Sequence, residues 1–304
     1  MTISKPRLSI ILLNYGNSKW LEKCLHSFHN LEHWTANGPE NIEVIVVDNG
    51  SKTSPLAELS QKFPWIKTIQ NEKNLGFAGG NNVGIKQATA PFVMLLNSDT
   101  EFKQNTDLLA LLEKFSDEKL AVVTPRLELT NGQLDPACHR GFPTPWNALM
   151  YYSGVAKLFP QAKWAAGYHL SWLDLKKAHE IEACSGAAMI VRQAAIAEVG
   201  VLDEDFFMYA EDIDWCYRFA QSGWKTLYDP QVTVIHHKYK SGQQTANWET
   251  KSKTISAFYD TMKQFMDKHY RRKYPRVILF LSFVMIDVLK KWKMHYERKQ
   301  YASK

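Results

Sequence analysis

Short apolar runs alternate with segments of helical periodicity through the first 125 residues of this 304-residue chain. The runs are almost continuously aliphatic or β-branched, which is typical of strands covered on both faces; they are Leu8–Leu13, Ile42–Val47, Ile66–Ile69, Phe92–Leu96 and Leu120–Val123. Between them the apolar spacing predicts helices at Ser18–Phe28, Pro55–Phe63, Gly80–Ala88 and Asn105–Phe115. This alternation predicts an α/β fold in three layers, with a mostly parallel central sheet flanked by helices.

The second half of the chain is less regular. Residues 125–180 are rich in Pro, Trp and Tyr, and no elements are predicted there. Regular structure resumes with Ile181–Val191, helices are expected at Gln193–Val199 and from Glu211 to about Ser222, and strands at Lys225–Tyr228 and Val232–His236. From Trp248 onward the pattern is helical with a break near Pro275, which predicts a C-terminal helical extension.

The positive charge of the chain is concentrated near its C-terminal end. The net charge is +6, but residues 271–304 hold ten basic and two acidic side chains, so the first 270 residues carry −2. Because this larger part is slightly acidic, nucleic acid is not an expected partner.

The four cysteines form no CxxC pair, which argues against a disulfide framework or a thiolate zinc site. The run Leu8–Leu13 is too short for a signal-peptide core, so a cytoplasmic location is expected.

Small polar residues follow four successive predicted strands. They are Asn14–Asn17, Asp48–Ser51, the glycine-rich Asn74–Asn82 and Asn97–Thr100. Each cluster alone is ordinary turn chemistry, but ligands of open parallel sheets bind at the carboxyl ends of the strands, so together they predict one binding rim. The glycines do not match GxGxxG, and no GxxxxGK[ST] loop is present, which argues against a dinucleotide-binding enzyme and a P-loop NTPase.

Three acidic or histidine clusters are candidates for chemistry. Asp99 follows an apolar strand and is suited to bind a divalent cation that neutralises a diphosphate, although a helix N-cap explains it equally well. Glu211, Asp212 and Asp214 open a helix, where they suit either the helix dipole or a general base tuned by partial burial. His236 and His237 end a strand and are metal-ligand candidates.

Several motifs in order resemble glycosyltransferase family 2, in its rhamnosyltransferase-like branch. They include Val-Asp-Asn-Gly-Ser (47–51), Asn-Leu-Gly-Phe-Ala-Gly-Gly-Asn-Asn (74–82), Leu-Asn-Ser-Asp-Thr (96–100), the stretch 200–218 around Tyr-Ala-Glu-Asp-Ile-Asp, and Val-Ile-His-His (234–237). The resemblance covers about residues 7–242 and implies a Rossmann-like GT-A fold over residues 1–242. It places a nucleotide-sugar half at about 1–125 and an acceptor and catalytic half at about 126–242, followed by a helical, basic region at 243–304.

The resemblance also implies roles for individual residues. Asn14 and Tyr15 would line the nucleotide pocket, Asp48 would accept a hydrogen bond from a pyrimidine base, and further donor contacts are implied for Asn74, Gly76, Asn81, Asn97 and Arg140. Asn97-Ser98-Asp99 matches the DxD-like element, so Asp99 would ligate Mg²⁺ or Mn²⁺ together with His236. Asp212 matches the catalytic base, with Glu211 and Asp214 in support.

The function implied is inverting, metal-dependent transfer of a sugar from a dTDP- or UDP-sugar, with dTDP-L-rhamnose as the expected donor. The implied acceptor is a lipid-linked or growing polysaccharide in cell-surface glycan synthesis. A non-catalytic nucleotide-sugar or carbohydrate-binding protein is an alternative, which the presence of both Asp99 and Asp212 disfavours. A nucleotidyltransferase is another, but Asn14–Asn17 lacks the basic phosphate-binding loop that such an enzyme needs.

The C-terminal region contains an apolar segment, Val277–Ile286, that is too short to span a bilayer. Basic residues flank it on both sides, with Trp292 and Tyr296 interleaved on the second. This pattern suits a helix lying in the anionic inner leaflet of a membrane, which predicts peripheral attachment to the cytoplasmic face. The alternative is packing against the body of the protein or against a second copy in a homo-oligomer.

Overall fold

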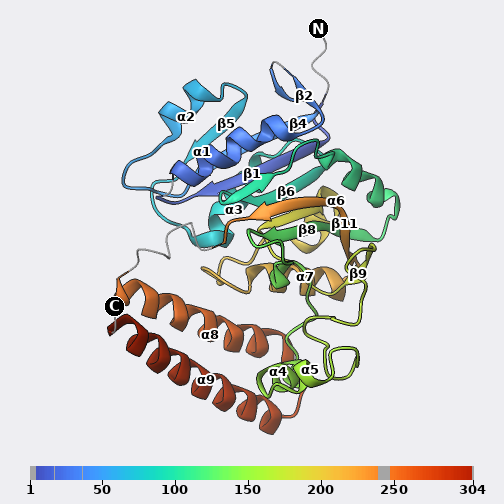
Figure 1. The fold of residues 1–304 in the computed structure, drawn as a ribbon, viewed down its shortest axis with the longest axis vertical. Coiled ribbons are helices and arrows are strands. Elements are labelled where there is room, and N and C mark those ends of the chain that lie inside the picture. The colour runs from blue at the N-terminus through green and yellow to red at the C-terminus, as the bar shows by residue number, and fades with distance from the viewer. Residues whose placement is uncertain (1–4, 17, 36, 239–246, 303–304) are drawn as a thin grey trace.

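The computed structural model describes residues 5–16, 18–35, 37–238 and 247–302. In this part of the chain, a main sheet has the strand order β5-β4-β1-β6-β10-β8-β11-β7, with β9 paired to β11. A separate small hairpin joins β2 (Trp34–Thr35) and β3 (Gly38–Pro39). The sheet crosses the upper part of the molecule in Figure 1, and a pair of long C-terminal helices lies below it.

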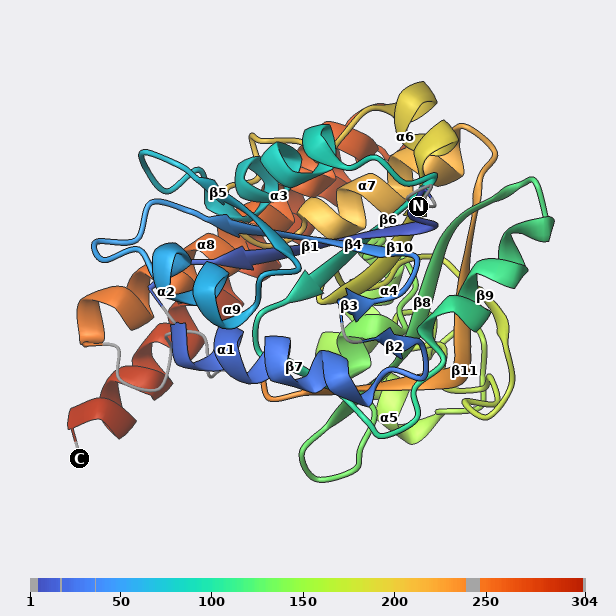
Figure 2. The ribbon, with the colours of Figure 1, turned by 90° about the horizontal axis from the view of Figure 1, so that it is seen from above.

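One half of the main sheet is parallel. It consists of β5 (Ile66–Gln70), β4 (Ile42–Asp48), β1 (Leu8–Asn14) and β6 (Phe92–Asn97). Helix α3 (Gly76–Gln87) covers one face and α1 (Ser18–Ser27) the other (Figure 2), while α2 (Leu56–Lys62) packs beside β5. The carboxyl ends of these strands therefore meet at one edge, as expected for parallel strands joined by helices.

The other half of the sheet is mixed. β10 (Ala188–Arg192) is antiparallel to both β6 and β8 (Leu120–Leu129), and β11 (Lys225–His236) is parallel to β8. The short strands β7 (Thr100–Phe102) and β9 (His179–Ile181) pair antiparallel with β11. Helices α6 (Gln193–Val199) and α7 (Glu211–Gln221) lie on the same face as α3 (Figure 2), and the 3₁₀ helix η2 (Leu108–Ser116) packs on β8.

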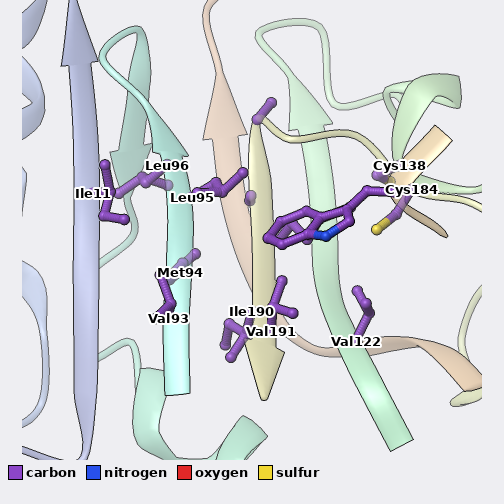
Figure 3. Close-up of a cluster of buried hydrophobic side chains, with 14 of the residues drawn as sticks. Ile11, Val93, Met94, Leu95, Leu96, Val122, Cys138, Cys184, Ile190 and Val191 are labelled. Carbon is purple, nitrogen blue, oxygen red and sulfur yellow. The ribbon is translucent and has the colours of Figure 1, made fainter. Parts of the chain in front are cut away.

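The hydrophobic core follows the central strands. Ile11, Leu95, Ile190 and Val122 come from β1, β6, β10 and β8 and have no exposed surface. Figure 3 shows these aliphatic side chains succeeding one another from strand to strand. Because burying a side chain of this size contributes about 1.5–3 kcal/mol, this row holds the parallel and the mixed halves together in one sheet.

The structure confirms the predicted mostly parallel sheet flanked by helices, with differences at element boundaries. Lys225–Tyr228 and Val232–His236 belong to a single strand, β11, whose pairing with β8 shifts between Asp229 and Thr233. The predicted helix at Asn105–Phe115 is the shorter 3₁₀ helix η2, because Asn105 takes a positive φ of 57° and Asp107 caps the turn through the Ala110 amide. Residues 125–180, left without elements, contain η3 (Pro136–Cys138), α4 (Pro145–Tyr152) and α5 (Val155–Leu158).

The C-terminal region forms a helical hairpin of α8 (Trp248–Tyr270) and α9 (Arg276–Ala302), which pack against each other. The predicted break near Pro275 separates the two helices. Across the described ranges, no helix combines the length and apolar character needed to cross a membrane.

A buried ion cluster joins this hairpin to α7. The Asp214 carboxylate has no exposed surface and accepts hydrogen bonds from Arg218 Nε (2.8 Å), Lys268 Nζ (2.6 Å) and His269 Nε2 (2.7 Å). Burial alone would raise the pKa of Asp214, but these three donors outweigh it and lower that pKa to about 2. Asp214, expected to support the catalytic base, therefore connects α7 to α8.

We expect Asp214→Asn to lower the free energy of unfolding by about 3 kcal/mol, because it leaves two cationic groups and a histidine around a neutral side chain. Because the folded-state pKa lies below the ordinary value, the stabilisation is present above about pH 4 and disappears as the pH falls towards 2. Urea denaturation at pH 7 and pH 3 measures both effects. Asp267→Asn, which removes a half-exposed carboxylate on α8, is the matched control and should change little. Equal stability of the two variants would contradict the cluster's role.

Candidate active site

The ends of β1 and β4 hold Asn14 and Asp48 side by side, in register. Asn14 Nδ2 donates to Asp48 Oδ1 over 2.9 Å, and Gln70 and Ser51 also donate to this carboxylate. Both side chains are buried, and Asn14 Oδ1 has no hydrogen-bond partner among the described residues. A nucleobase that bonded to Asp48 would have to replace one of its present donors, whereas Asn14 Oδ1 is an acceptor still open. Tyr15, beside them, is 56% exposed.

The glycine-rich loop is organised by side-chain amides. Asn49 Nδ2 donates to Asn74 Oδ1 (3.0 Å) and to the Gly76 carbonyl (2.9 Å), while the Gly76 amide donates to Asn74 Oδ1 (2.8 Å). Asn81 is buried and donates to the Phe77 carbonyl within α3. These contacts place Asn74 and Asn81 within the framework of the loop; Asn49 is a residue that sequence reasoning did not single out.

The same loop contacts the segment that precedes α7. The Phe77 amide donates to the Phe207 carbonyl over 2.8 Å. Gly76 has a φ of +76°, and a Cβ atom there would lie 2.3 Å from that carbonyl oxygen. Tyr209 and Ala210, the last residues before α7, also take positive φ values of 73° and 66°. Strained backbone of this kind persists only where its surroundings hold it, which the glycine-rich loop does here.

Asp99 and His236 lie together at the edge where β7 pairs with β11. His236 Nε2 is 3.4 Å from Asp99 Oδ1, and both side chains are buried. His236 Nδ1 lies 2.8 Å from Asp135 Oδ2. Burial lowers the pKa of His236, but hydrogen bonds to Asp135 and Asp99 outweigh it and raise that pKa to about 9. His237 instead contacts Glu101, over 2.7 Å.

The chemistry of this pair fits a divalent cation that arrives with a ligand of its own. Among the residues that the structure describes, no group of three or more His, Cys, Asp or Glu side chains could hold a metal ion. Asp99 and His236 offer one carboxylate oxygen and one imidazole nitrogen, a set that Mn²⁺ accepts readily and Mg²⁺ less so. Phosphate oxygens and water would complete an octahedral shell. The pair therefore suits an ion bound jointly by protein and diphosphate.

Asp212 is the accessible carboxylate at the start of α7. Its Oδ2 accepts hydrogen bonds from Arg140 Nη2 (3.0 Å) and from the Gly186 amide (3.2 Å), and its side chain is 14% exposed. Arg140 Nη2 also donates to the Cys184 carbonyl, whereas its buried Nε has no hydrogen-bond partner in the described part of the chain. Burial lowers the pKa of Arg140, but the nearby Asp212 carboxylate outweighs it and raises that pKa above its ordinary value.

Glu211 differs from its neighbour. Its side chain is buried, and Oε2 has no hydrogen-bond partner among the residues described. Burial, reinforced by the charge of Asp212, raises the pKa of Glu211 well above its ordinary value. Of the three carboxylates that open α7, Asp212 is therefore the one whose side chain is partly exposed and within reach of a ligand.

Segment 185–187 contacts both Asp212 and the end of β6, which leads to Asp99. The Gly186 amide donates to Asp212, and the next residue, Ala187, accepts a hydrogen bond from the Asn97 amide over 3.0 Å. Asn97 lies two residues before Asp99, at the end of β6. Asp212 and the turn that holds Asp99, far apart in sequence, are thus connected through two adjacent residues, Gly186 and Ala187.

The model of one protein family, glycosyl transferase family 2, matches residues 9–200. The chain belongs to this family. The mixed, mostly parallel sheet flanked by helices is its GT-A fold.

The proteins that this family 2 member is similar to include two rhamnosyltransferases and a mannosyltransferase. The N-acetylglucosaminyl-diphospho-decaprenol L-rhamnosyltransferase of Mycobacterium tuberculosis is 25% identical over 253 residues, covering 79% of each chain. The rhamnosyltransferase WbbL of Escherichia coli is 23% identical over 257 residues, covering 80% of this chain and 89% of WbbL. Among solved structures, the mannosyltransferase PcManGT of Pyrobaculum calidifontis with GDP-Man and Mn²⁺ matches with a TM-score of 0.59 at 16% identity, over 95% of this chain and 72% of that one.

Besides Asn49, sequence reasoning missed Asp135 in this candidate site. Asp135 lies in a segment without a predicted element, and it meets His236 across 101 positions. Its local signal, an Asp before Pro136, is that of a helix N-cap, which Asp135 also is. No local pattern indicates the contact with His236, because only the pairing of β8 with β11 creates it.

We expect Gly76→Ala to destabilise the protein by about 1–3 kcal/mol more than Gly132→Ala, since only the first change forces atoms into a filled space. Both glycines have positive φ, but a Cβ at position 132 meets nothing within 4 Å. Gly132→Ala therefore measures the backbone penalty alone, about 1 kcal/mol, and the additional loss in Gly76→Ala measures the clash with Phe207. Urea denaturation midpoints of the two variants give the comparison. Equal losses would show that the contact between the loop and Phe207 is not tight.

Proposed function

We propose that this family 2 member is an inverting, divalent-metal-dependent glycosyltransferase. The observation that carries the proposal is that Asp212 and Asn97, two residues before Asp99 of the Asp99–His236 pair, contact the adjacent residues Gly186 and Ala187. The rhamnosyltransferase names of two relatives support dTDP-L-rhamnose as the donor, and one of those names supports a saccharide on a polyprenyl diphosphate as the acceptor. The product would then be a lipid-linked glycan, an intermediate of cell-surface polysaccharide synthesis.

In such a transfer, the acceptor hydroxyl attacks the anomeric carbon from the face opposite the departing diphosphate. Asp212 takes the hydroxyl proton on a carboxylate oxygen, a contribution of about 10²–10⁴ in rate for a positioned general base. Arg140 and the Gly186 amide fix the carboxylate through Oδ2, so the base keeps one orientation while the substrate enters. We also propose that an oxygen of the donor is the acceptor for the unpartnered Nε of Arg140.

Asp99 and His236 would hold Mn²⁺ or Mg²⁺, which supplies positive charge to the departing diphosphate. Asn14 Oδ1 would accept a hydrogen bond from the nucleobase, and Tyr15, largely exposed beside Asn14, would cover the nucleobase. The donor's two ends are thus assigned to β1 and to the turn after β6. These are neighbouring strands of the parallel half, paired in register from Leu8 to Leu13.

Asp212→Asn keeps the size of the side chain but removes its ability to take a proton. We expect transfer from dTDP-L-rhamnose to a synthetic polyprenyl-diphosphate N-acetylglucosamine to fall about 10²–10⁴-fold, followed by dTDP release. Affinity for dTDP with Mn²⁺, measured by calorimetry, should stay within about threefold, because donor binding does not use the proton. Asp205→Asn, an exposed residue nearby in sequence, should leave both quantities unchanged. Retained turnover in Asp212→Asn would remove Asp212 from the base role.

The exposed apolar residues of α9, α4 and α5 are our proposed site of membrane attachment, and we call them the apolar face. On α9 its exposed residues are Val277, Leu281, Val284 and Val288, which share one side of the helix. On α4, α5 and the residues after them it includes Trp146, Leu149, Leu158, Phe159 and Trp164, and α4 packs against α9.

Basic side chains border the apolar face. Arg271, Arg272 and Lys273 are exposed between α8 and α9, Arg276 is exposed at the start of α9, and Lys291 follows the apolar row on the same side. Apolar side chains bordered by cations match an anionic bilayer surface, where each basic residue contributes about 1 kcal/mol. We therefore propose peripheral attachment to the cytoplasmic leaflet, where a lipid-linked acceptor is accessible.

We expect the protein to sediment with vesicles that contain phosphatidylglycerol and to remain in solution with pure phosphatidylcholine vesicles. Leu281→Glu should reduce binding at least tenfold by placing a charge in the apolar face. Gln61→Glu, the same change of charge on exposed α2, should not reduce it. Absence of lipid binding, together with a dimer by light scattering that Leu281→Glu dissociates, would instead identify this face as a contact between two copies.

A further inference from the structure

Asp135 is a buried carboxylate that the proposed reaction does not otherwise use. It has no exposed surface and accepts from three donors. Oδ2 lies 2.8 Å from His236 Nδ1, while Oδ1 accepts from Lys238 Nζ (2.8 Å) and from the Ala137 amide (3.0 Å). The two oxygens are thus divided: one faces the histidine, and the other holds Lys238 and the cap of η3.

This division determines what His236 can do. A carboxylate only accepts hydrogen bonds, so Nδ1 keeps its proton, and when a metal ion displaces the proton of Nε2 the lone pair is on Nε2. Nε2 is the nitrogen that faces Asp99, at 3.4 Å. A hydrogen bond to the second ring nitrogen is what fixes the tautomer and the ring orientation of metal-binding histidines.

We propose that Asp135 is a positioning residue, which holds His236 with Nε2 ready to ligate the metal ion of the nucleotide-sugar donor. The inference rests on the proposed function, because it needs Asp99 and His236 to bind that ion. It assigns a role to a segment that also carries Arg140 five residues later, whose backbone pairs with Ala183. One short stretch of chain then orients a metal ligand at one end and the base at the other.

The competing explanation is that Asp135 only stabilises the fold through Lys238 and the cap. Two substitutions separate these explanations, because the carboxylate oxygens have different partners. Asp135→Asn retains an oxygen for the Ala137 amide but turns an NH₂ group towards Nδ1, which moves the proton of neutral His236 to Nε2 and blocks ligation. Lys238→Met removes the ion pair at Oδ1 and leaves the contact with His236.

The experiment is calorimetric titration of Mn²⁺ into the full chain at saturating dTDP. We expect Asp135→Asn to weaken Mn²⁺ binding about 10–100-fold, the loss typical of removing a partner of a metal-binding histidine. Lys238→Met should bind within about threefold of the parent protein, and Asp99→Asn should lose most of the binding. Thermal denaturation of each variant reports separately on stability.

Two results would overturn the inference: unchanged Mn²⁺ affinity in Asp135→Asn, or an equal loss in Lys238→Met. Should the amide variant not fold, Asp135→Ser still offers a hydroxyl to cap η3 and removes the same contact, so it should show the same loss. In a His236→Gln background, Asp135→Asn should cause no further loss, because the partner through which it acts is already gone. If the parent protein itself binds no Mn²⁺ with dTDP, the metal dependence of the proposed function fails as well. This outcome differs from one in which the parent protein binds Mn²⁺ and Asp135→Asn binds it equally well.

Discussion

The antiparallel pairing of β10 with β6 is the constraint on which the rest of the site depends. β6 ends at Asn97, and β10 begins at Ala188 opposite Leu96, so the residues that lead into β10 lie where β6 ends. A parallel strand in this place would carry its leading residues to the opposite edge of the sheet. The reversal therefore puts the Gly186 amide and the Ala187 carbonyl between Asp212 and the turn that holds Asp99.

The three carboxylates at the start of α7 show how burial and partners divide similar groups into different roles. Asp214 is buried among donors from Arg218, Lys268 and His269, and its pKa is lowered to about 2. Glu211 is buried without such partners, and its pKa is raised. Asp212 has one cationic partner and a partly exposed side chain. Neighbouring carboxylates in contrasting environments are the usual way for a protein to separate a structural anion, a neutral acid and a base.

The sequence predicted the fold and the residues at the strand ends because both follow from local patterns. Apolar runs of strand length located β1, β4 and β6, and the polar residues after them come to one edge in any parallel sheet. Contacts between distant segments left no such signal. Asp135 meets His236, and Asn49 meets Asn74, through side-chain geometry that no spacing rule describes. The resemblance implies that Asp214 supports Asp212, but nothing in the local sequence indicates that Lys268 and His269 of α8 bind the Asp214 carboxylate.

The helical hairpin connects the two parts of the proposed function. α7 carries Asp212, and Asp214 on the same helix bonds to Lys268 and His269 of α8, which packs against α9, the helix that carries part of the apolar face. Asp212 is therefore connected to the apolar face through α7, the buried ion cluster and the helical hairpin. A soluble acceptor would need no fixed orientation of this kind. A lipid-linked acceptor does, because its diphosphate stays at the level of the headgroups and the base has to be held at a constant height above them. In the proposed function, the ion cluster would stabilise the fold and also set the distance between Asp212 and the bilayer.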